Sequence, residues 1–144
     1  MTIDFTRVIT AGDKATAAAE ARAMRIKTEC RARILAVVGE AAQANIAQAG
    51  VIYAAMRSDG VGPAQARGAV GLAEGDLDTV AMWKAWVTAM QTECRRAIAE
   101  GVAPVWPDVP ERVAEMATRF CGAPASPPGQ ALPVPGDPGP QDTR

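Results

Sequence analysis

Residues 76–101 read DLDTVAMWKAWVTAMQTECRRAIAEG and carry the clearest helical pattern in the chain. The run contains no proline, and Asp76 and Gly101 are typical of a helix N-cap and a helix stop. Large apolar side chains recur in it at three- and four-residue steps, which predicts a helix with one buried stripe. The stripe consists of Leu77, Val80, Trp83, Val87, Met90, Cys94, Ala97 and Ile98. Trp86 lies beside it.

A second helical pattern comes earlier, because residues 12–50 contain no proline and only one internal glycine, Gly39. Thr10 is a candidate N-cap, with Asp13 in the capping-box position. Residues 11–57 are therefore expected to form one long amphipathic helix, or two helices joined near Gly39. The apolar stripe is narrow, as in a coiled coil or a bundle within an assembly. It consists of Met24, Ile26, Cys30, Ile34, Val37, Val38 and Ala41.

The remaining segments connect or flank these helices. Residues 58–75 are rich in glycine and are expected to form a connecting loop, and 1–10 an extended arm. Prolines punctuate 102–110, after which a short helix is expected, so that 76–122 forms a hairpin-like C-terminal helical region. The buried side of the short helix is expected to be Val113, Met116, Ala117 and Phe120. Residues 123–144 form a Pro/Gly-rich tail, and the predicted fold class is all-α with one core.

Alanine dominates the apolar composition of the 144 residues. Hydrophobic residues make up 49% of the chain, but aromatic residues make up only 4%. An alanine side chain removes little apolar surface from water, so an isolated chain has little burial with which to offset its conformational entropy. We therefore expect contacts with other chains, either by docking or by self-association, for which a trimer is one arrangement.

Charge is balanced overall but not along the sequence. The chain has fifteen Lys and Arg residues and sixteen Asp and Glu residues. It therefore lacks the net positive charge that favours binding to nucleic acid, which is not expected as a partner. The segment 14–40 is locally basic, however: Lys14, Arg22, Arg25, Lys27, Arg31 and Arg33 outnumber Glu20, Glu29 and Glu40. Two interpretations stay open for it, a solvated helix face or a docking stripe for an acidic partner.

The side chains most often used in catalysis and metal binding are scarce. The chain has no histidine, and Cys30, Cys94 and Cys121 lie too far apart in sequence for a zinc motif. Asp76 and Asp78 are two positions apart, so they do not face each other on a helix, and both suit a helix start. We therefore expect no enzyme activity, metal or cofactor. No apolar run reaches the length of a membrane span, so membrane insertion is not expected.

The segment 82–110 resembles part of the tail-fibre assembly and tail-assembly-chaperone-like proteins of tailed bacteriophages. In those families a helix with a Trp-Lys-x-Tyr-Arg element leads through a short loop to a Trp-Pro-x-x-Pro close. Here Trp83-Lys84 matches the first element and 106–110, WPDVP, matches the second, whereas Trp86 and Val87 replace the Tyr and Arg. The opening residues 4–10, DFTRVIT, followed by an alanine-rich helix, are similar to small proteins encoded among phage tail genes.

The resemblance implies a non-catalytic structural or assembly component of a phage tail, associated with a fibre or baseplate. It would be made in the host bacterial cytoplasm and located in the virion tail, with other tail proteins or itself as partners. The alternative is an intracellular helical adaptor with a disordered tail. Residues expected to pack in the core or against a partner are Ile26, Cys30, Ile34, Val37, Val38, Trp83, Trp86, Met90, Trp106 and Pro107. Trp83 and Trp106 are expected to lie in one apolar cluster.

Overall fold

The structure is a computed structural model that describes residues 10–122. Five helices follow one another in this part of the chain, which contains no strand. They are α1 (Ala11–Val37), α2 (Glu40–Ser58), α3 (Pro63–Ala69), α4 (Asp76–Glu100) and α5 (Glu111–Phe120). The all-α prediction with a long first helix is confirmed. Residues 1–9 of the expected arm and the expected tail at 123–144 lie outside the described residues.

Helix α1 begins where the capping pattern predicted. The Asp13 backbone N–H donates to Thr10 Oγ1 at 3.1 Å, and the Thr10 backbone N–H donates to Asp13 Oδ2 at 2.9 Å. The Thr10 hydroxyl also donates to the same carboxylate, and these bonds lower the pKa of Asp13. Two of the backbone donors that a helix start leaves open are thereby satisfied.

The long helical pattern divides into α1 and α2 at Val38 and Gly39, so the single-helix alternative is wrong. Val38 is extended, and its side chain is completely buried in an apolar cluster with α5. The Gln43 side chain donates to the Val38 carbonyl at 2.8 Å, which satisfies an acceptor at the break. Turning the chain here lets Val38 leave the α1 stripe and join a second core.

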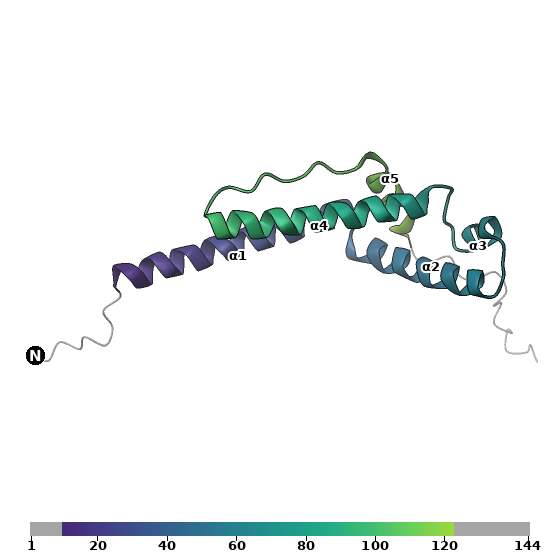
Figure 1. Ribbon diagram of the computed structural model, residues 1–144, viewed down its shortest axis with the longest axis horizontal. Helices are drawn as coiled ribbons and strands as arrows, with labels where there is room; N and C mark the ends of the chain where they lie inside the picture. The colour runs from purple at the N-terminus through teal and green to yellow at the C-terminus, as the bar shows by residue number, and fades with distance from the viewer. Residues whose placement is uncertain (1–9, 123–144) are drawn as a thin grey trace, which may run out of the picture.

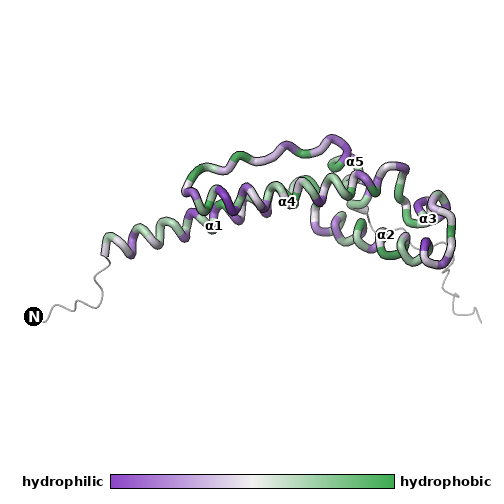
Figure 2. Tube along the Cα trace, viewed as in Figure 1, coloured by the Kyte–Doolittle hydropathy of each residue, from purple (hydrophilic) through white to green (hydrophobic). Residues whose placement is uncertain are grey.

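Two apolar clusters hold the helices together. Helices α1 and α4 run side by side in opposite directions, and α2 packs on α5, which also contacts α4 (Figure 1). Polar and apolar residues interleave along α1 and α4, as expected for helices that each bury one side (Figure 2). The first cluster, between α1 and α4, has Ile26, Cys30, Trp86, Met90, Cys94 and Ala97 as its buried members. The second has Val38, Ala42, Ile46, Val113, Met116 and Ala117.

The glycine-rich segment 58–75 is not a loop throughout, because α3 lies within it. Pro63 occupies the first turn of α3, where its missing N–H costs nothing, and Ala66 is completely buried. The flanking turns use Gly60, Gly71 and Gly75, which have φ values of 83°, 71° and 81°. The glycines therefore mark the ends of a short helix.

The buried stripe of α4 is rotated from the predicted one. Trp86 is 5% exposed and central to the first cluster, whereas Leu77 is 40% exposed and Trp83 and Val87 are half-buried. The reason is that residues 102–110, which we call the Trp-Pro segment, run back along α4 (Figure 1). The Pro107 carbonyl of this segment accepts the Trp86 Nε1–H, which places the segment over Trp86. Periodicity within one helix does not reveal which side a distant segment covers.

Asp76 has a different role from the predicted N-cap. Gly75 is the cap residue, and the Asp76 side chain is completely buried. Its Oδ2 accepts the Ala73 backbone N–H at 2.7 Å, and its Oδ1 accepts from Arg119 at 2.6 Å. Burial favours the neutral acid, but the Arg119 and Ala73 hydrogen bonds outweigh it and lower the pKa of Asp76. The carboxylate ties the start of α4 to the end of α5.

Candidate functional site

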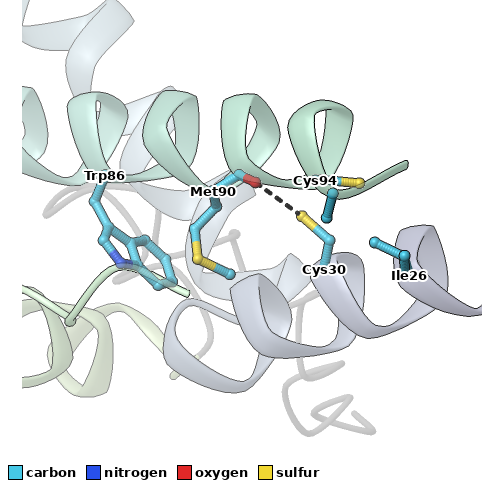
Figure 3. Close-up of a cluster of buried hydrophobic side chains, with 6 residues drawn as sticks. Ile26, Cys30, Trp86, Met90 and Cys94 are labelled. Atoms are coloured by element: carbon cyan, nitrogen blue, oxygen red, sulfur yellow. Dashed lines mark hydrogen bonds between the residues drawn. The ribbon is translucent and has the colours of Figure 1, made fainter. Parts of the chain in front are cut away.

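The candidate site lies at the interface between α1 and α4. Ile26 and Cys30 from α1 meet Trp86, Met90 and Cys94 from α4 (Figure 3). The Cys30 thiol donates to the Met90 carbonyl, with 3.7 Å between Sγ and O. Burial, followed by the neighbouring Cys94, raises the pKa of Cys30, so this thiol behaves as a neutral core group.

The Trp-Pro segment fastens this interface from one side. Trp86 Nε1 donates to the Pro107 carbonyl at 3.1 Å, and Trp106 Nε1 donates to Glu29 Oε1 at 2.9 Å. The guanidinium of Arg33 lies over the Trp106 ring, 5.6 Å from its centre. The Trp106 and Arg33 hydrogen bonds lower the pKa of Glu29. Helices α1 and α4 are thus joined through this segment as well as directly.

A further anchor attaches the segment to the end of α4. The Val105 backbone N–H donates to Glu93 Oε1 at 2.6 Å, and Arg96 donates to both oxygens of the same carboxylate. These hydrogen bonds, that of Arg96 first, lower the pKa of Glu93 to about 2. Arg22 on α1 caps the end of α4 by donating to the Gly101 carbonyl.

Most of the ten residues predicted to pack do so inside the chain. Trp83 and Trp106 both pack against the first cluster, which confirms that they share one apolar cluster. Ile34 and Val37 also pack there, Val38 lies in the second cluster, and Pro107 accepts the Trp86 N–H. Ile26, Cys30, Trp86 and Met90 are buried in the first cluster.

On another side, α1 and α4 leave an open groove, which we call the α1–α4 groove. It consists of two adjoining hollows of about 570 and 330 Å³, which share Ile34, Gln43 and Val87. Trp83, Lys84 and Thr88 line only the smaller hollow. The apolar floor of the groove consists of Cys30, Ile34, Leu35, Trp83, Val87 and Cys94. Of the ten predicted residues, Cys30, Ile34 and Trp83 therefore border it.

The rim of the groove is mostly cationic. Lys27 and Arg31 come from α1, and Lys84 and Arg95 come from α4. The carboxylate among the lining residues is Glu40, which pairs with Arg31 at 2.9 Å. Both side chains of that pair are more than 70% exposed, so the pair contributes little stability. Lys27, Lys84 and Arg95 make no ion pair within residues 10–122.

One residue that lines the groove has a buried donor without a partner. Trp83 Nε1 is buried and makes no hydrogen bond within the described part of the chain. Leaving such a group unsatisfied costs about 1–3 kcal/mol. Trp83 is therefore placed at the groove without an internal hydrogen bond, in contrast to Trp86 and Trp106.

Sequence reasoning missed the contribution of α4 to this basic rim. Lys84, Val87, Gln91 and Arg95 recur at three- and four-residue steps, which places them on one side of the helix. That pattern was available in the sequence. Its proximity to Lys27 and Arg31 was not, because it depends on how α1 and α4 pair.

Residues 10–122 contain neither a metal-binding cluster nor a membrane-spanning helix. No group of His, Cys, Asp or Glu side chains there is arranged to hold a metal ion, and no helix there is long and apolar enough to cross a membrane. Comparisons with known protein families, curated proteins and solved structures find no match to the chain.

Proposed function

We propose that the chain is a non-catalytic structural or assembly component of a bacteriophage tail that acts by packing against other proteins. The observation that carries the proposal is the α1–α4 groove, whose apolar floor is formed in part by the segment that resembles tail-assembly proteins. An apolar surface between two helices is suited to receiving another polypeptide. The proposed place of action is the fibre or baseplate, after synthesis in the host cytoplasm.

The start of α1 supports a need for other chains. Residues 11–20 are exposed along their whole length, and α1 extends past the end of α4 (Figure 1). Most helical stability in proteins comes from tertiary packing, and an isolated helix this short is marginal in water. A neighbouring protein or further copies of the chain, arranged for instance as a trimer, would supply that packing.

The experiment is fractionation of phage particles from cells in which the gene carries a small epitope tag. A structural component is expected to remain in particles at fixed stoichiometry through gradient purification, and an assembly factor to be required for tails while absent from them. Electron microscopy of particles from a deletion strain detects the second case. A deletion strain that makes normal tails, with no tagged chain in the particles, would favour the intracellular adaptor instead.

A further inference from the structure

We infer that the α1–α4 groove binds an acidic amphipathic helix of a different protein. This inference rests on the proposed function and specifies the chemistry of the partner. The apolar floor favours a partner with apolar side chains along one face. The rim cations Lys27, Arg31, Lys84 and Arg95 favour carboxylates on both sides of that apolar face. Only some of the cations in the basic segment 14–40 line the groove, and the others lie elsewhere.

The other cations of that segment are engaged elsewhere or lie away from the groove. Arg22 caps the end of α4, and Arg33 pairs with Glu29 and lies over Trp106. Lys14 and Arg25 are exposed and do not line the groove. The docking interpretation therefore applies to Lys27 and Arg31, and the packing of α4 adds Lys84 and Arg95 to them.

The dimensions of the groove suit a helix of about three turns. Lys84 and Arg95 are eleven positions apart on α4, a rise of about 16 Å. A third helix along this line would present apolar residues at steps of three and four to Ile34, Leu35 and Val87. An extended peptide would find no sheet edge to join, because residues 10–122 contain no strand.

Charge distinguishes the acidic helix from the other occupants. A basic helix would bring like charges against the unpaired cations of the rim. A nucleic acid strand would match the cations but would place phosphates and sugars over an apolar floor. The exposed Arg31–Glu40 pair contributes little, so Arg31 exchanges Glu40 for a partner carboxylate at small cost.

The test uses the full chain and a fluorescent, hydrocarbon-stapled helical peptide of about 14 residues. Leucines lie along one side of the peptide and glutamates flank them; a second peptide has lysine at every glutamate position. Fluorescence anisotropy is expected to show binding of the glutamate peptide at least about tenfold tighter than that of the lysine peptide. The affinity is expected to fall as the salt concentration rises from about 0.05 to 0.3 M.

Charge reversal identifies the surface. The double variant Lys84→Glu and Arg95→Glu is expected to lower the affinity for the glutamate peptide by about tenfold or more, because electrostatic attraction at the rim becomes repulsion. The matched control, Lys14→Glu and Arg25→Glu, changes the net charge equally away from the groove and is expected to retain binding. Circular dichroism verifies that both double variants keep the helicity of the original chain.

Several outcomes would overturn the inference. They are equal binding of both peptides, no binding of the glutamate peptide, equal losses in both double variants, or binding of oligo-dT in place of the peptides. Self-association abolished by the groove variant would make a second copy the occupant. Particle fractionation is independent of this assay. If the tagged chain is found in particles but does not bind the glutamate peptide, only the acidic partner is rejected. If the chain binds the peptide but has no role in tails, the proposed function is rejected.

Discussion

Replacing Trp86 with alanine is expected to lower the free energy of unfolding by about 3–5 kcal/mol. Trp86 is 5% exposed in the first cluster, so the change opens a cavity between α4 and its neighbours. It also removes the donor to the Pro107 carbonyl. Urea denaturation followed by circular dichroism measures the loss without depending on the tryptophan signal. Trp106→Ala is expected to cost less, because Trp106 is only half-buried.

Two further variants make this result interpretable. Trp86→Phe keeps a ring in the cluster and is expected to lose about 1–2 kcal/mol, so it gives a measurable value even if the alanine variant fails to fold. Met82→Ala lies on the same helix at 41% exposure and is expected to stay within about 0.5 kcal/mol of the original chain. A loss for Trp86→Ala as small as that for Met82→Ala would mean that the Trp-Pro segment does not cover Trp86.

Replacing Asp76 with alanine is expected to cost about 2–4 kcal/mol of stability at pH 7. The buried carboxylate accepts from Arg119 and Ala73, and both donors would lose their partner. Arg119 is partly exposed, so water compensates for part of the loss on its side. Asp78→Ala is the matched control, because it removes an exposed carboxylate from the same first turn and is expected to cost less than about 1 kcal/mol.

The Asp76 contribution is also expected to depend on pH. Its pKa is lowered by folding, so the stabilisation is complete above the unfolded value of about 3.9 and is lost as pH falls through the lower folded value. The difference in unfolding free energy between the original chain and Asp76→Asn should therefore shrink in that acidic range. A difference that stays constant down to about pH 2 would show that the ion pair with Arg119 is not the cause.

Features that depend on local sequence patterns, such as helix starts and apolar periodicity, are predictable from the sequence. Features that depend on contacts between distant segments are not. The capping box at Thr10 follows from a local pattern and is present. The expected buried side of α5 is also present in Val113, Met116 and Ala117, whereas Phe120 is only half-buried. The short α3 was missed because its glycines resemble a loop when burial of Ala66 is unknown. The periodicity of α4 puts Trp86 beside the stripe, because the segment that covers Trp86 lies some twenty positions later in the sequence.

The sequence indicates individual residues of the candidate site but not how they come together. The sequence shows the basic character of α1 around Lys27 and Arg31, and Trp83 stands in the segment that resembles a family motif. The groove itself depends on the antiparallel pairing of α1 with α4, which brings Arg95 into the same hollow as those cations and Lys84 into the adjoining one. A second packing relation, between Asp76 and Arg119, is equally invisible in sequence because 43 positions separate the two residues.

The proposal that the chain binds another tail protein through the α1–α4 groove is tested most directly by site-specific photo-cross-linking. A benzophenone amino acid at Gln91 lies in the groove, and the same group at the exposed Gln65 on α3 provides the control. In cells that assemble the particles, Gln91 is expected to cross-link to an acidic helical peptide of one tail protein, whereas Gln65 does not. Cross-links from Gln91 only to unrelated host proteins, or to the same proteins as from Gln65, would contradict the claim.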